Sequence, residues 1–259
     1  MTRVTTAFAA ALALFLPVGR PLLVGLTPAV GMFTGLLTTQ AAYAQNATDW
    51  FDSGIAKAKR GDWQGAIADF TKTIEMYPRY GIAYYNRGVA REELSDFRGA
   101  IADYTKAIEM SPRYANAYYN RGFGKYNLKD YRGAIADYTK AIEYNPDFAQ
   151  AYNRRGVAKA KLKDYQGAIV DYTKAIEIDP NDPITHFNSG NAKSKLNDFQ
   201  GAIVDYTKAI EVSPEYYMAY TNRGIILEMI GDRKGACRDW KKAVDLGDTK
   251  PIEWVRNEC

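Results

Sequence analysis

Residues 97–110 read FRGAIADYTKAIEM, and almost the same letters return as YRGAIADYTKAIEY at 131–144, YQGAIVDYTKAIEI at 165–178 and FQGAIVDYTKAIEV at 199–212. A proline follows shortly after each segment, at 112, 146, 180 and 214, and with an earlier one at 78 these five prolines stand 34 residues apart. A fixed period of this length indicates a repeat protein, in which each copy is one small unit stacked on its neighbours. The period divides the chain into six frames, residues 47–80, 81–114, 115–148, 149–182, 183–216 and 217–250.

Each frame predicts two helices joined by a short turn. Glycine always occupies frame position 8 and alanine always occupies frame position 20. Because a glycine inside a helix costs about 1 kcal/mol relative to alanine, its recurrence indicates close contact between the two helices. An aspartate such as Asp96 precedes each second helix, where its carboxylate can accept hydrogen bonds from the free amides of the first turn. The proline near the end of each frame disfavours continuing that helix. The predicted fold class is therefore all-α.

Bulky side chains are predicted to fill the space between the paired helices. At frame position 4 these are Trp50, Tyr84, Tyr118, Tyr152 and Tyr220. At frame position 24 they are Phe70, Tyr104, Tyr138, Tyr172, Tyr206 and Trp240. The single histidine, His186, stands at position 4 of the fifth frame. We expect it to pack in the place of the tyrosine and not to bind a ligand.

This combination resembles the tetratricopeptide repeat family, whose copies set an aromatic at position 4, Gly at 8, Ala at 20, an aromatic at 24, Ala at 27 and Pro at 32. The resemblance covers residues 47–250, with local departures at Thr73, His186 and Asp248. It implies an α-solenoid, a right-handed superhelix of six helix-turn-helix repeats. It also implies that the first helices line a concave groove that binds another protein or an extended peptide.

Frame positions 2, 6, 9 and 13 form a helical stripe nearly opposite the stripe that faces the partner helix. Position 6 is Asp52, Asn86, Asn120, Arg154, Asn188 and Asn222. An asparagine amide offers a donor and an acceptor, which suits the peptide bonds of an extended ligand. The row resembles the asparagine ladder of some tetratricopeptide superhelices, although Asp52 and Arg154 interrupt it. The neighbouring rings of Phe51, Tyr85, Tyr119 and Phe187 are candidates for apolar pockets. The alternative is that the asparagines are solvated or bond to neighbouring helices.

A second device of the family is a carboxylate clamp for the C-terminus of a partner. Asn191, Asn222 and Arg256 fall near its frame positions, but Phe187 and Ile252 stand where lysines are expected. The clamp is therefore the weaker hypothesis.

Charged residues also recur with the period, with arginine common at position 7 and aspartate constant at position 23. We predict that these form ion pairs which fix the angle between units. The lysines at position 26, such as Lys140, are expected on a solvated outer face.

Composition argues against catalysis, metal binding and nucleic-acid binding. Without residues 1–44, which contain Arg3 and Arg20 and no acid, 32 basic and 30 acidic residues remain, a net charge of +2. A nearly neutral body has no electrostatic footprint for nucleic acid. One histidine and two cysteines leave few side chains for a catalytic triad or a zinc site, and no phosphate-binding glycine-rich loop is present. We therefore predict no enzyme activity and no cofactor.

The first 44 residues are predicted to be a signal peptide. A basic residue, Arg3, precedes apolar stretches, and Ala42-Tyr43-Ala44 offers the small residues that a signal peptidase accepts. Cleavage after Ala44 would leave a domain of residues 45–259 in the periplasm or outside the cell. The alternative is an uncleaved anchor over 21–43, which would make the chain an accessory subunit of a membrane-bound enzyme or transport complex. Membrane contact is expected only in that case.

The last residues are predicted to cap the solenoid, since Pro251 can open a short helix over 251–259 that carries Ile252, Trp254 and Val255. Cys237 replaces an inward-facing isoleucine at the end that this helix would cover, and Cys259 ends the helix. In an exported chain the two cysteines are expected to form a disulfide.

Overall fold

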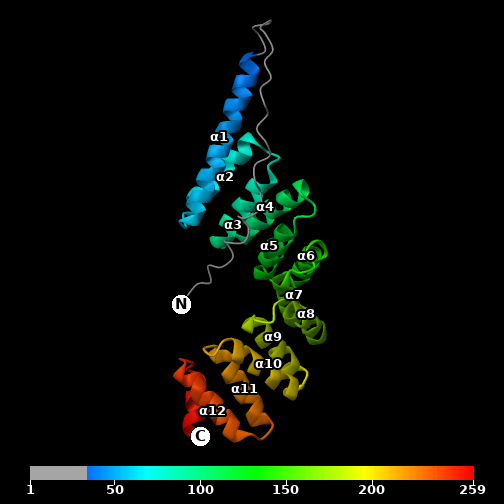
Figure 1. Cartoon of the computed structure of the whole chain (residues 1–259), viewed down its shortest axis with the longest axis vertical. Coiled ribbons are helices and arrows are strands. Elements are labelled where there is room, and N and C mark those ends of the chain that lie inside the picture. Colours follow the sequence, from blue (N-terminus) through cyan, green and yellow to red (C-terminus); the bar gives the residue numbers. More distant parts are fainter. Residues whose placement is uncertain (1–33) are drawn as a thin grey trace. The chain divides into compact units, whose positions relative to one another are not determined.

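The computed structural model describes residues 34–259, with side chains from residue 46. Within that range every regular element is an α-helix, and consecutive helices pair into six hairpins (Figure 1). The helices are α1 (Thr34–Lys59), α2 (Trp63–Met76), α3 (Gly81–Glu93), α4 (Phe97–Met110), α5 (Ala115–Asn127), α6 (Tyr131–Tyr144), α7 (Ala149–Lys161), α8 (Tyr165–Ile178), α9 (Pro183–Lys195), α10 (Phe199–Val212), α11 (Tyr217–Met229), α12 (Arg233–Asp245) and α13 (Ile252–Glu258). The predicted hairpins and the predicted all-α solenoid are confirmed.

The aspartate before each second helix is an N-cap, as predicted. Asp96 Oδ1 accepts a hydrogen bond from the backbone N–H of Gly99 at 3.0 Å, and the other five hairpins repeat the contact at 2.9 Å. A Cβ added at Gly99 would lie 2.1 Å from Asp96 Oδ2. The cap therefore explains why glycine recurs at frame position 19.

The aromatic rings of frame position 24 are the centre of each hairpin. Tyr104 and Tyr138 have no exposed surface, and Tyr172 is 2% exposed. A Cβ at Gly156 would lie 2.6 Å from the ring of Tyr172, and the other position-8 glycines face their rings in the same way. The close approach predicted from the glycines is confirmed, and its partner is the position-24 ring.

The rings of frame position 4 were expected in the core, and for Trp50, which is 40% exposed, this expectation is wrong. The four tyrosines at this position are half-buried, and an arginine guanidinium lies over each ring, as Arg87 does over Tyr84 at 5.5 Å. His186 is buried in the tyrosine position as predicted. Its Nε2 lies 2.9 Å from the Pro180 carbonyl, just as the Tyr118 hydroxyl donates to the Pro112 carbonyl.

In four of the six hairpins, the arginine of the internal ion pair also bonds to the preceding repeat. Asp137, which is 3% exposed, accepts from Arg121 Nε and Nη2 at 2.9 and 2.7 Å and pairs with Lys125 at 2.8 Å. The remaining Nη1 of Arg121 donates to the hydroxyl of Thr105 in the preceding repeat. Arg87, Arg155 and Arg223 make the same bridge. The predicted pairs are confirmed, and the threonine contact is what links neighbouring units.

The junction of the fourth and fifth repeats lacks this bridge, because position 7 of α9 is Ser189. Asp205 keeps only Lys193, whose Nζ lies 2.8 Å from Oδ2 but outside hydrogen-bonding geometry. Instead, Asn153 of α7 donates to Asp182 and Thr185. Asn153 and Asp182 stand at frame positions 5 and 34, where the next repeat has the aromatic pair Phe187 and Tyr216. At this junction a polar cluster thus replaces the aromatic pair.

We expect Ser189→Arg to stabilise the protein by about 1 kcal/mol, since it restores a partner for Asp205 and a donor for Thr173. Urea unfolding followed by circular dichroism measures the change. Ser53→Arg is the matched control, because Ser53 holds the same position beside Asp69 but has no preceding repeat to bridge. A gain no larger than that of the control would show that the inter-repeat bridge adds nothing.

The C-terminal end is covered by α13. The ring of Trp254 packs on that of Trp240 with centroids 5.2 Å apart, and Pro251 is buried, whereas Ile252 remains 38% exposed. Cys237 and Cys259 lie side by side in disulfide geometry, with their Cα atoms 5.6 Å apart. The predicted cap is therefore present, and Trp254 makes the main contact.

Residues 1–33, which hold most of the predicted signal peptide, lie outside the described residues. The compact unit of the repeats begins at Tyr43, and Ala44 lies within α1. No helix between residues 34 and 259 is both long and apolar enough to cross a bilayer.

Candidate binding surface

The first helices of the hairpins form a continuous row. Along the solenoid, α3 touches α5, α5 touches α7, α7 touches α9 and α9 touches α11. In the part of the chain that the structure describes, no second helix touches the second helix of the next repeat. The row of first helices is therefore the inner side of the curve, and we call the surface made by α3, α5, α7, α9 and α11 the inner face.

The asparagines of frame position 6 use their amide nitrogens to bond within the protein. Asn120 donates to the hydroxyl of Tyr85, Asn188 to Oδ1 of Asn153 and Asn222 to Oδ1 of Asn191, each across a repeat junction, at 3.2, 3.2 and 2.8 Å. Asn86 donates to the carbonyl of Ile82 in its own helix. No described residue donates a hydrogen bond to their four side-chain oxygens, so each carries a fixed, unused acceptor.

The aromatic rings of position 5 lie in the packing between repeats. Tyr85 is 8% exposed, and the centroid of its ring lies 5.7 Å from that of Tyr104 and 4.8 Å from that of Tyr114. The rings of Phe51, Tyr119 and Phe187 are held by equivalent pairs. These rings thus pack between repeats, and only that of Tyr85 is buried, whereas those of Phe51, Tyr119 and Phe187 are partly exposed.

Apolar surface on the inner face comes from position 2, one helical turn before the asparagines. Ile82, Ile184 and Met218 are 40%, 51% and 37% exposed. In the middle of the row Arg154 is exposed, with its guanidinium 5.2 Å from the Phe123 ring centroid. The inner face therefore combines exposed apolar side chains with amides, and the guanidinium of Arg154 lies among them.

Models of the tetratricopeptide repeat family match residues 51–115, 115–148, 149–182 and 185–216. The chain is a tetratricopeptide repeat protein. Comparison with curated proteins found no match.

Solved structures share the fold. PilF of Pseudomonas aeruginosa is 17% identical with a TM-score of 0.70, covering 83% of this chain and 99% of its own. YrrB, described as having an unusual peptide-binding site, is 24% identical with a TM-score of 0.61, covering 72% and 94%. MamA is 24% identical with a TM-score of 0.62, covering 66% and 94%. These likenesses establish the solenoid architecture of this tetratricopeptide repeat protein.

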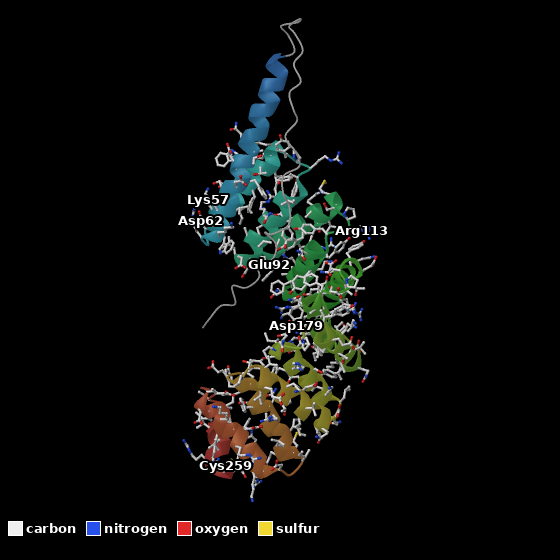
Figure 2. The ribbon with its side chains drawn as sticks, in the orientation of Figure 1. Lys57, Asp62, Glu92, Arg113, Asp179 and Cys259 are labelled. Carbon is white, nitrogen blue, oxygen red and sulfur yellow. A yellow bond between two sulfur atoms is a disulfide. The ribbon has the colours of Figure 1, made fainter. Side chains whose placement is uncertain are left out.

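The repeat pattern did not point to one residue of the inner face, Glu92. Glu92, near the end of α3 (Figure 2), is half-buried at frame position 12, outside the stripe of positions 2, 6, 9 and 13. The Tyr104 hydroxyl donates to its Oε2 at 2.9 Å, and burial raises the pKa of the Glu92 carboxyl to about 7. The only sequence signal was that the other repeats, apart from Glu228 in the sixth, carry no acid at this position.

The residues of the alternative clamp are engaged in other contacts or lie apart. Asn191 Oδ1 accepts from Asn222 and also from the Tyr206 hydroxyl at 2.8 Å. Arg256 is exposed on the short α13. The two asparagines thus support each other and Tyr206.

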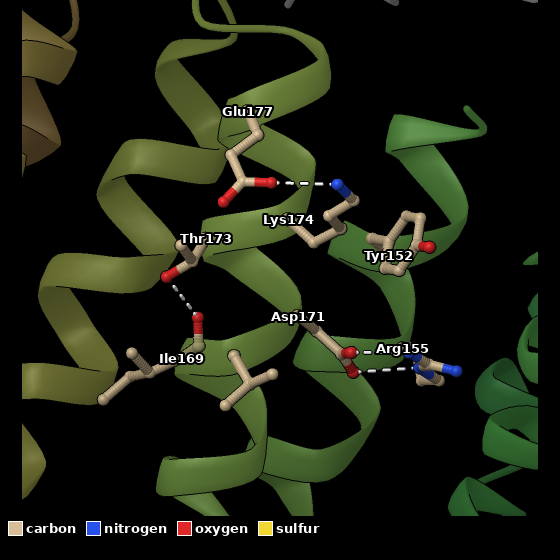
Figure 3. Close-up of a pocket in the computed structure, with 8 residues that line it drawn as sticks. Tyr152, Arg155, Ile169, Asp171, Thr173, Lys174 and Glu177 are labelled. Atoms are coloured by element: carbon tan, nitrogen blue, oxygen red, sulfur yellow. Dashed lines mark hydrogen bonds and ion pairs between the residues drawn. The ribbon is translucent and has the colours of Figure 1, made fainter. Parts of the chain in front are cut away.

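A shallow hollow of about 380 Å³ lies between α7 and α8, around Val170. Figure 3 shows its polar wall, with Asp171 held by Arg155 and Lys174 held by Glu177. Each charged group in the wall already has a partner. Among the described side chains no three His, Cys, Asp or Glu residues gather in a way that could hold a metal ion.

Proposed function

We propose that this tetratricopeptide repeat protein is a non-enzymatic scaffold whose inner face holds an extended segment of a partner protein. The observation that carries the proposal is the row of fixed amide acceptors on Asn86, Asn120, Asn188 and Asn222 beside exposed apolar side chains. Backbone N–H groups of an extended peptide need such acceptors, and exposed apolar surface marks interaction sites. Because the amide nitrogens are held in place, little ordering entropy is lost on binding.

The test uses peptides selected from a random displayed library on the wild-type protein. We expect replacement of the four asparagines by alanine to weaken binding of the selected peptides about tenfold or more, because several hydrogen bonds are lost together. Fluorescence anisotropy measures the affinities, and circular dichroism checks that helicity is unchanged.

The matched control replaces four outward lysines of frame position 26 by alanine, Lys106, Lys140, Lys174 and Lys208, which are exposed and paired only with glutamates one turn away. Asn86→Ala alone is a second variant, since it removes no bond between repeats. Failure of the wild type to select any peptide, or equal losses in both quadruple variants, would refute the proposal.

We further propose that the protein works outside the cytoplasm, after cleavage following Ala44, with the Cys237–Cys259 disulfide formed there. The Ala-Tyr-Ala sequence at 42–44 and the pairing geometry of the two cysteines support this. We expect intact-mass analysis of the exported fraction to find a chain that begins at Gln45, and thiol titration of the denatured, unreduced protein to find no free thiol. An unprocessed chain in the membrane fraction would favour the anchored accessory subunit instead.

A further inference from the structure

The carboxylate of Glu92 is the one acidic group at the floor of the inner face in the second repeat. Its single hydrogen bond comes from Tyr104, itself fully buried, and its Oε1 makes none. No cation of the described residues forms an ion pair with it. Arg154 is the basic group that faces it across the surface, but the guanidinium of Arg154 lies against Phe123. A half-buried carboxylate without a cation is destabilised, and this is relieved either by a proton or by a cation that a partner supplies.

The surroundings of Glu92 are tyrosines from successive repeats. Tyr85 and Tyr104 are buried beside it, and their pKa values are raised by burial. Tyr138 of the next repeat also reaches this region, where Glu92 and Arg154 both act on its hydroxyl electrostatically. That hydroxyl is buried and has no hydrogen-bond partner among the described residues, although the equivalent groups of Tyr104 and Tyr206 have one. The region thus contains an unpaired anion and an unsatisfied hydroxyl.

We propose that Glu92, with the tyrosines around it, forms a pocket that selects a lysine or arginine side chain of the polypeptide held on the inner face. An ammonium or guanidinium group of the ligand can pair with the half-buried carboxylate and donate a hydrogen bond to its free Oε1. Charge complementarity favours this occupant, because an acidic or apolar side chain would leave Glu92 uncompensated. The proposal rests on the proposed function. It adds which type of ligand side chain the scaffold selects and the position on the inner face where that side chain binds.

The experiment selects peptides from a random displayed library on the wild-type protein and on Glu92→Gln. We expect wild-type peptides to carry lysine or arginine at one fixed position and to lose about tenfold or more in affinity for Glu92→Gln. Replacing the basic residue of the peptide by glutamine should cause a similar loss, and combining the two changes should add little. Glu228→Gln, at the same frame position but paired with Arg233, should bind as the wild type does.

Acidity gives an independent measurement. Burial raises the pKa of the Glu92 carboxyl to about 7, and the titratable or charged groups around it are Tyr85, Glu93, Tyr104, Tyr138 and Arg154. Affinity for the basic peptides should therefore rise between pH 6 and pH 8, as the carboxyl loses its proton. The same peptides should show no such rise with Glu92→Gln. Selected peptides without a fixed basic residue, or with equal affinity for Glu92→Gln, would overturn the pocket while leaving the scaffold intact. Failure to select any peptide would overturn both.

Discussion

Asp137→Ala is expected to lower the free energy of unfolding by about 3 kcal/mol. The carboxylate of Asp137 is buried and compensates two cations, Arg121 and Lys125, whose side chains are 17% and 24% exposed. Its removal leaves both cations partly desolvated and without their partner. Arg121 is then no longer held in the orientation in which it donates to the Thr105 hydroxyl. Each repeat contacts only its neighbours. Loss of the Asp137 carboxylate therefore also weakens the contact between the second and third repeats.

Urea unfolding followed by circular dichroism measures this effect. Asp205→Ala is the matched variant, and we expect it to cost about 1 kcal/mol, because its carboxylate has only Lys193. Glu143→Ala, which breaks the exposed pair with Lys140, should change stability by less than about 0.5 kcal/mol. The idea that these aspartates hold the repeats together fails if Asp137→Ala is no more damaging than Asp205→Ala.

Tyr138→Ala is expected to cost about 3–5 kcal/mol, because it removes a ring with no exposed surface from the centre of a hairpin. Tyr138→Phe, in contrast, should leave stability unchanged or increase it slightly, since the hydroxyl it removes has no hydrogen-bond partner. The stability lost in Tyr138→Ala therefore measures the packing of the ring, and the change in Tyr138→Phe measures the contribution of the hydroxyl.

Tyr104→Phe gives the opposite expectation at the same frame position. Its hydroxyl donates to Glu92, so its removal should cost about 1–2 kcal/mol and leave the carboxylate without any donor. Thermal unfolding of the two phenylalanine variants measures the difference. Equal behaviour of Tyr104→Phe and Tyr138→Phe would show that the two hydroxyls are in the same environment, which would also remove one support for the Glu92 pocket.

The position of the candidate surface was predictable, but the state of its side chains was not. The period alone placed Asn86, Asn120, Asn188 and Asn222 on one face. Their hydrogen bonds differ because each asparagine meets whatever the preceding repeat offers, a tyrosine hydroxyl for Asn120 and another amide for Asn188. The period of a repeat sequence gives the frame position of each residue, but it does not give the residue that it contacts in the neighbouring repeat.

The sequence by itself determined the solenoid. Glycine at position 8, alanine at 20, the capping aspartate and the closing proline are local requirements that each copy meets within its own frame, so the period is sufficient to read them. Only the tertiary structure decided which rings are core, that Ser189 removes a bridge, and that Glu92 lies shielded under Tyr104. The reason is that burial and hydrogen bonding depend on distances between residues of different helices and different repeats, and these distances are fixed only when the hairpins stack.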